Sequence, residues 1–183
     1  MRHDGWVIVE SLLASLTALP ASDSRDAYLS FVGSRGLAAL RRGGEPEHVT
    51  GSCFVFSPDF SQVLLCFHKK GQFWVQFGGH IEYDDASVAL GAQREAREES
   101  GIATLSLLSH DIADLDRHEL HGGFSCAAHW DVGFVAVVDP SVSFEVSDES
   151  EDVRWFAVDS LPENVASGLP QRIAQVLRSF SQS

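Results

Sequence analysis

The chain has 183 residues, of which 44% are hydrophobic and 21% are charged, so its size and composition are those of a single globular domain. It carries 26 acidic residues against 13 lysines and arginines, which gives a formal net charge of −13. Because such a surface repels phosphate backbones and anionic lipid, we expect neither nucleic acid nor a membrane as partner. A phosphorylated substrate would need local cations, and metal ions bound by carboxylates could supply them.

Residues 1–45 are predicted to form a helical N-terminal extension, with helices at 4–19 and 25–40 separated by Pro20 and a Ser/Asp cap region. The first segment loosely resembles a signal peptide. However, Glu10 interrupts its apolar run and its leucines follow the helical period, so we expect an amphipathic helix that belongs to the fold. No stretch of the sequence is long and apolar enough to span a bilayer.

The three cysteines are sparse and show no metal-ligand spacing in the sequence: Cys53, Cys66 and Cys126. This pattern is typical of reduced thiols, so it predicts a cytoplasmic protein.

The pattern then changes to strands and predicts a core at residues 48–162, followed by a C-terminal helix within residues 163–183 that begins at Pro170. The predicted strands are 49–57, 62–68, 73–77, 80–82, 102–108, 114–121, 129–138 and 153–158. A helix is predicted at 86–100, capped by Asp84 or Asp85 and ended by Gly101, with Gly91 as a weak point in its middle. Strands flanked by helices at both ends predict an α/β fold.

Three glutamates of this central helix stand out. Glu95, Glu98 and Glu99 are at positions i, i+3 and i+4, so they share one helix face and repel one another unless a cation lies between them. Hard oxygen ligands in this number suit Mg²⁺ or Mn²⁺. Arg94 precedes Glu98 by one helical turn and can hold that carboxylate in one rotamer. The plain alternative is a solvated, salt-bridged surface helix.

A strand that ends in Gly78-Gly79, then a loop, then R94-E95-A96-R97-E98-E99-S100-G101-I102, resembles the Nudix box of the Nudix hydrolases. The box would run from Gly79 to Ile102, and the resemblance extends over about residues 48–162. It implies an α/β/α sandwich with a mixed central sheet, to which the N-terminal helices are added. Two features depart from the family pattern: Asp85 replaces the usual first glutamate, and its spacing to Arg94 is one residue longer than usual.

The resemblance implies a Mg²⁺-dependent (or Mn²⁺-dependent) hydrolase that cleaves a diphosphate linkage in a nucleoside triphosphate or a nucleoside diphosphate derivative. The Gly79 carbonyl, Glu95, Glu98 and Glu99 would bind metal. Glu98 would also activate the water, and Arg94 would orient Glu98. In some relatives a glutamate from a distant loop is the base, and the candidates here are Glu149 and Glu151.

Other residues have two interpretations each. Lys69 and Lys70 could meet substrate phosphates or could belong to a solvated hairpin. His129 could contact substrate or be a structural residue, and with His118 and His121 it suggests a histidine cluster.

Two further classes compete with the hydrolase. One is a catalytically inactive Nudix-fold nucleotide sensor, and the other is an isopentenyl diphosphate isomerase, which needs a catalytic cysteine beside the box. The intact glutamates oppose the first, and the context of the cysteines opposes the second. No proline occurs between Ile102 and Val138, so the ADP-ribose type of pattern is missing. The N-terminal helices offer a surface for a homodimer.

Overall fold

The computed structural model describes residues 4–43, 46–120, 126–146 and 150–180. The helices are α1 (Asp4–Ala18), α2 (Asp23–Arg35), the 3-10 helix η1 (Gly36–Leu40), α3 (Val88–Ser100) and α4 (Leu169–Phe180). The strands are β1 (Glu47–Phe56), β2 (Gln62–His68), β3 (Phe73–Val75), β4 (Phe77–His80), β5 (Asp114–Glu119), β6 (Ala128–Val137) and β7 (Ser150–Ala157).

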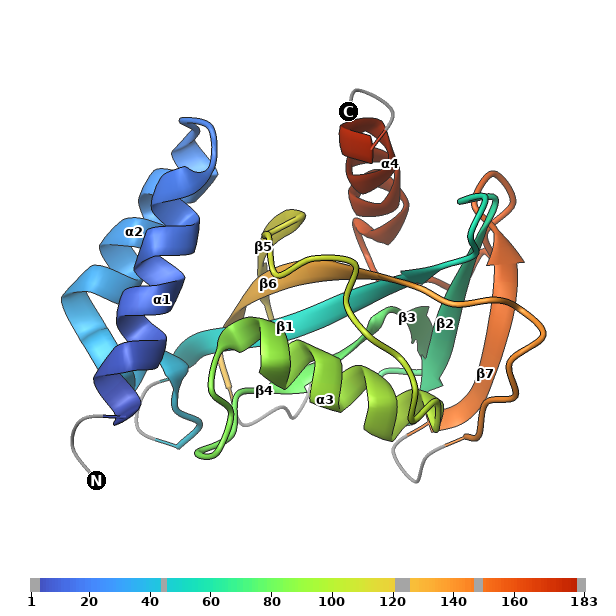
Figure 1. Cartoon of the computed structure of the whole chain (residues 1–183), viewed down its shortest axis with the longest axis horizontal. Coiled ribbons are helices and arrows are strands. Elements are labelled where there is room, and N and C mark those ends of the chain that lie inside the picture. The colour runs from blue at the N-terminus through green and yellow to red at the C-terminus, as the bar shows by residue number, and fades with distance from the viewer. Residues whose placement is uncertain (1–3, 44–45, 121–125, 147–149, 181–183) are drawn as a thin grey trace.

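Strand β1 organises a mixed, seven-stranded sheet. One edge of β1 pairs in parallel with β6 over its whole length, and the other edge pairs antiparallel with β4 and then with β2. The main path runs β3-β2-β1-β6-β5, while β7 pairs with β2 and β4 pairs with β1 (Figure 1). Strand β4 therefore lies beside β1 where the β1–β2 pairing has not yet begun, and this places the glycine pair next to the middle of the sheet.

Helices cover both faces of the sheet (Figure 1). Alternate residues of β1 point to opposite faces. On one face Phe54 and Phe56 form a buried cluster with Ile173 and Val176 of α4. On the other face α3 approaches β1 so closely that a Cβ added at Gly51 would lie 3.1 Å from the Cβ of Ala92. The predicted α/β/α sandwich with a mixed central sheet and N-terminal helices is confirmed.

The N-terminal helices pack against the sheet through direct side-chain contacts. The ring of Phe31 in α2 stacks on Trp130 of β6 with 4.3 Å between centroids, and the Tyr28 hydroxyl donates to the Asp131 carbonyl at 2.7 Å. The predicted helix 25–40 is wrong beyond Arg35, because Gly36 takes a positive φ of 55° and residues 36–40 form η1. Among the described helices, none has the length and apolar character needed to cross a membrane.

The predicted strand at 102–108 is also wrong. Its strand-like contacts with β6 are an isolated bridge between Leu107 and Ala136 and a hydrogen bond from the Leu108 amide to the Val135 carbonyl at 2.7 Å. Side chains of α3 hold the segment instead: Arg97 donates to the Leu105 carbonyl at 2.6 Å, and Gln93 accepts from the Leu107 amide at 3.0 Å. These bonds take up the backbone groups that a strand would need for pairing.

The predicted strands near the glycine pair are corrected as well. The predicted run 73–77 is divided into β3 and β4 at Gln76, and the strand expected at 80–82 ends at His80.

We expect Gly51→Val to destabilise the fold, because its side chain would force α3 away from β1. The Cβ alone would lie 3.1 Å from both the Ala92 Cβ and the Val88 carbonyl oxygen. Overpacking of this kind costs about 1–3 kcal/mol of unfolding free energy, measurable by urea denaturation. The matched control is Gly33→Ala, where an added Cβ meets no atom within 4 Å and should leave stability equal or higher. Equal midpoints for the two variants would contradict the tight packing of α3 on β1.

Candidate active site

Helix α3 has well-defined ends that fix its position on the sheet. The Ser87 hydroxyl caps its N-terminus by accepting from the Leu90 amide. The predicted cap at Asp84 or Asp85 is therefore wrong. Gly101 ends the helix in the left-handed region with φ 68°, as expected, and its amide donates to the Arg97 carbonyl. Ala92 and Ala96 are fully buried against the sheet, and the carboxylates therefore lie on the remaining faces.

Arg94 connects three parts of the site. Its guanidinium binds Asp85 through two hydrogen bonds of 3.1 and 2.9 Å and donates to the His80 carbonyl at 3.1 Å. Its remaining nitrogen pairs with Glu95 at 3.0 Å and with Glu98 at 3.1 Å. The hydrogen bonds to Asp85 raise the pKa of Arg94 further above its usual value, so the guanidinium stays charged. Loop, strand and helix are thus held by one cation.

Asp85 reaches Arg94 although its side chain is shorter than the glutamate usual in the family. Its carboxylate also accepts from the Glu82 amide at 2.7 Å, which closes the loop on itself. Gly91 makes this approach feasible, because a Cβ there would lie 2.9 Å from the Asp85 carboxylate and 3.0 Å from the Ile81 side chain. The mid-helix glycine, expected only to weaken α3, is where the loop packs against the helix.

The three glutamates differ in their surroundings. Glu99 is 6% exposed and accepts from the Gly78 amide at 2.8 Å. The Glu95 carboxylate lies on the backbone of Gly79, where an added Cβ would be 2.5 Å from the carboxyl carbon. The Glu98 side chain is 60% exposed at the outer side of the helix. Two carboxylates therefore point at the glycine pair and the third remains open to water.

This arrangement fits a divalent cation. The Glu95 carboxylate occupies the space above Gly79 that a side chain at that position would fill, and the Glu99 carboxylate lies at the neighbouring Gly78 amide. An all-oxygen donor set suits Mg²⁺ or Mn²⁺.

A cleft of about 770 Å³ opens in front of the glycine pair, a volume typical of small-molecule sites. Glu95 and Glu99 form part of its wall, and Lys69 and Lys70 contribute positive charge. Strands β1 and β6 contribute a polar floor that consists of Thr50, Ser52, His129 and Asp131.

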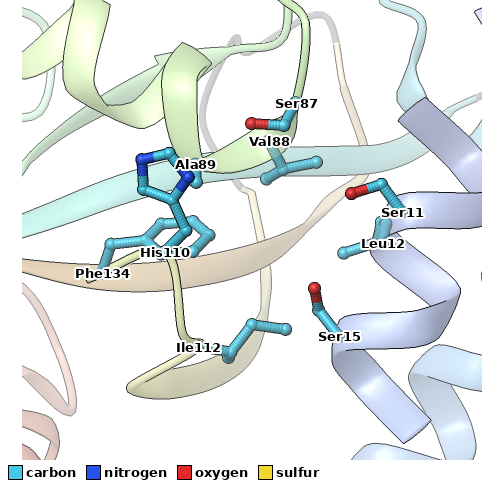
Figure 2. A pocket seen from close by; sticks show the side chains of 9 residues that line it. All are labelled: Ser11, Leu12, Ser15, Ser87, Val88, Ala89, His110, Ile112 and Phe134. Carbon is cyan, nitrogen blue, oxygen red and sulfur yellow. The ribbon is translucent and has the colours of Figure 1, made fainter. Parts of the chain in front are cut away.

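Figure 2 shows a smaller hollow between α1 and the start of α3, with a volume of about 80 Å³. Ser11 and Ser15 of α1 face Val88 and Phe134 across it. Because one water takes up about 30 Å³ of liquid, this hollow suits a few waters and not a nucleotide. We regard it as a packing gap between the N-terminal extension and the core.

Of the remaining predicted residues, His118 lines the cleft: its ring centroid is 5.6 Å from that of His129, and it pairs with Asp116 at 2.8 Å. Glu151 lies apart on an exposed hairpin, where it accepts from the Gln72 amide group at 2.9 Å. Glu149 and His121 lie outside the described residues.

Sequence reasoning missed His48 and Cys126, which both line the cluster around His129. A period of two along His48-x-Thr50-x-Ser52 and His129-x-Asp131 was the signal that could have placed these side chains on one sheet face.

The mixed sheet between helices and the cleft walled by carboxylates define an α/β/α domain with an acidic site that fits a divalent cation. The NUDIX domain family matches residues 46–180. The chain therefore belongs to the Nudix family, and its enzyme class is that of the Nudix pyrophosphohydrolases. The comparison with curated protein sequences gives no match.

Several solved structures share the fold. The MutT protein from Methanosarcina mazei Go1 has a TM-score of 0.61 at 18% identity, covering 76% of this chain and 99% of its own. The dihydroneopterin triphosphate pyrophosphohydrolase of E. coli has a TM-score of 0.60 at 18% identity, with 73% and 97% covered. A bifunctional NMN adenylyltransferase/ADP ribose pyrophosphatase from Francisella tularensis, complexed with AMP and a Mn ion, has a TM-score of 0.54 at 20% identity, with 86% and 50% covered.

We expect Asp85→Ala to destabilise the site, because it removes the bidentate partner of Arg94. The Asp85 side chain is 7% exposed and that of Arg94 is 23% exposed, so water replaces the lost bonds poorly. Losing a hydrogen bond to a charged group costs about 1–3 kcal/mol, which thermal unfolding would detect. Asp84→Ala is the control, since it removes the same charge from an exposed neighbour. A fall in stability of the same size in both variants would contradict the specific role of Asp85.

Proposed function

We propose that the chain is a Mg²⁺- or Mn²⁺-dependent Nudix hydrolase that cleaves a diphosphate linkage in a nucleoside triphosphate or a small nucleoside diphosphate derivative. The observation that carries the proposal is the placement of Glu95 and Glu99 against Gly78 and Gly79 in the wall of a cleft of about 770 Å³. A Mn ion accompanies AMP in one enzyme of the same fold, which supports the choice of metal.

Glu95, Glu98, Glu99 and the Gly79 carbonyl would hold the metal. When bound, the ion neutralises the diphosphate oxygens and makes the bridging oxygen a better leaving group. Glu98 accepts the proton of the attacking water, and its 60% exposure lets that proton pass on to solvent. Arg94, which pairs with Glu98 at 3.1 Å, positions this carboxylate and does not touch substrate. Glu149 and Glu151 are the alternative bases.

The positive charges of Lys69 and Lys70 in the cleft fit the phosphates of the substrate. Lys69 and Lys70 line the cleft in a chain whose net charge is −13, so they offset the local repulsion of an anion. His129 lines the same cleft, but its ring lies against those of His48 and His80, so the two lysines are the phosphate contacts in this proposal.

The substrate class rests on two observations. Two enzymes of the same fold are named for a triphosphate and for ADP ribose, so the fold alone does not choose between them. The absence of proline between Ile102 and Val138 in the sequence disfavours the ADP-ribose type.

We also place the enzyme in the cytoplasm. Cys53 and Cys66 are core thiols whose pKa values are raised by burial, and such residues need no oxidising compartment.

Hydrolysis of nucleoside triphosphates, nucleotide sugars, ADP-ribose and dinucleotides, each with Mg²⁺ or Mn²⁺, tests the proposal. Glu98→Gln should lower kcat by about 10²–10⁴-fold, the usual contribution of a general base, with a smaller change in nucleotide binding. Glu10→Gln on the exposed side of α1 is the charge-matched control and should keep wild-type turnover. Binding of nucleotide or metal without turnover of any substrate would favour the sensor instead, and unchanged turnover in Glu98→Gln would move the base to Glu149 or Glu151.

Lys70→Ala should raise KM more than it lowers kcat, because a lysine at the cleft wall binds phosphate equally in the ground state and the transition state. Arg178→Ala removes the same charge from an exposed position of α4 and should change neither constant. Steady-state kinetics on the substrate found in the panel would separate the two effects. Equal KM values for wild type and Lys70→Ala would remove this lysine from the substrate site.

A further inference from the structure

Three histidines and a cysteine from separate parts of the chain converge at one end of the cleft. They are His48 of β1, His80 of β4, His129 of β6 and Cys126 just before β6. One ligand atom from each side chain lies within 4.8 Å of those of all the others. The ring centroids of the histidines are 4.9, 5.1 and 5.4 Å apart.

The sheet register produces this cluster. His48 and His129 are direct partners in the parallel β1–β6 pair, so their side chains stand next to each other on one face. His80 is opposite Thr50 on the other side of β1, and Thr50 shares the face of His48. Three paired strands therefore place the three histidines of the cluster, and Cys126 joins them from the segment that leads into β6.

The buried imidazole nitrogens have no hydrogen-bond partner among the described residues. His48 is 1% exposed, and both of its ring nitrogens are unpaired. The Nε2 atoms of His80 and His129 are buried and unpaired as well. Leaving a buried polar group unsatisfied is unfavourable, so several of them side by side point to a missing ligand that accepts lone pairs.

The donor atoms of the cluster suit a cation. A neutral imidazole carries a lone pair on one ring nitrogen, and the buried nitrogens that lack a hydrogen-bond partner can offer theirs to a metal. Arg42 lines the same cleft, and its positive charge opposes a bound cation. A thiolate at Cys126 would offset that charge, and the Asp131 carboxylate acts in the same direction at His129.

We propose that His48, His80, Cys126 and His129 bind a zinc ion, separate from the carboxylate site of α3. Imidazole and thiolate donors select zinc over Mg²⁺, which prefers oxygen. In a tetrahedral site with bonds of about 2.0–2.3 Å the donor atoms are about 3.3–3.8 Å apart, which small side-chain rotations of this cluster can reach.

Four protein ligands complete the tetrahedron, so the zinc has a structural role and holds strands together. Its effect extends to the carboxylate site through His80, because this residue follows Gly79 directly and its carbonyl accepts from Arg94 at 3.1 Å. The zinc would therefore fix the end of β4 at the wall of the cleft.

The test is the zinc content of protein purified without a polyhistidine tag and without added metal. We expect the wild type to carry an equimolar amount of zinc by mass spectrometry, and we expect His48→Gln and Cys126→Ser to lose it. Two controls should keep their zinc: His110→Gln, which changes an exposed histidine outside the cluster, and Glu98→Gln, which changes the carboxylate site. Because the readout is metal content, failure of this proposal is distinguishable from failure of the proposed hydrolysis.

Replacement of zinc by Co²⁺ identifies the ligands and guards against variants that fail to fold. After Co²⁺ is added to wild-type apoprotein, its absorption spectrum should show tetrahedral d–d bands and a near-ultraviolet thiolate-to-cobalt band. Cys126→Ser, a conservative change, should keep its circular dichroism and lose the thiolate band. Chelation should lower the Tm of the wild type and leave that of Cys126→Ser unchanged. A wild type that binds neither zinc nor cobalt, or a Cys126→Ser variant that keeps both the metal and the thiolate band, would overturn the proposal.

Discussion

The ion-pair centre at Arg94 is the interaction on which the site depends. A guanidinium offers five donors in a fixed plane, and here they are shared among the loop at Asp85, the carbonyl at the end of β4, and two glutamates of α3. Without this cation four carboxylates would stand close together in a chain that is already strongly acidic. Arg94 neutralises part of that charge, and the carboxylates leave a net negative charge toward the cleft. This negative charge is what a divalent cation needs.

A second, buried network of polar side chains includes three residues of the cleft floor. The Asp131 carboxylate accepts from Thr50, Ser52 and Arg172 at 3.0, 2.6 and 2.6 Å, and Arg172 also binds Asp114 at 2.7 Å. Burial raises the pKa of Asp114 even though Arg172 opposes the shift. A buried network of this kind is favourable only when every member is satisfied, so it fixes the positions of α4, β1, β5 and β6 relative to one another. The apolar cluster of α4 lies on one side of it and the histidines lie on the other.

The sequence was informative where the interactions are local. The helix from Val88 to Ser100, its glycine stop and the position of Arg94 one turn before Glu98 all follow from helical spacing. It failed where the decisive partner is distant: residues 102–108 have strand-like composition, but side chains of α3 take up their backbone groups. His48 could not be joined to His129 either, because only the pairing of β1 with β6 brings them together. In the sequence Gly91 looked like a weak point of the helix. Its role is to leave room for Asp85, whose loop cannot be positioned from residue spacing alone.

His80 connects the two proposed metal sites, because its carbonyl lies at one site and its imidazole at the other. Its carbonyl belongs to the oxygen-rich side, where Arg94 and the glutamates favour a hard cation. Its imidazole belongs to the nitrogen- and sulfur-rich side, where a hard cation gains little and zinc gains much. The two ions are thereby sorted by donor chemistry and not by distance. Because the ring and the carbonyl of His80 are attached to the same Cα, a zinc ion that holds the ring would limit the movement of that Cα. It would thereby help to hold the carbonyl to which Arg94 donates.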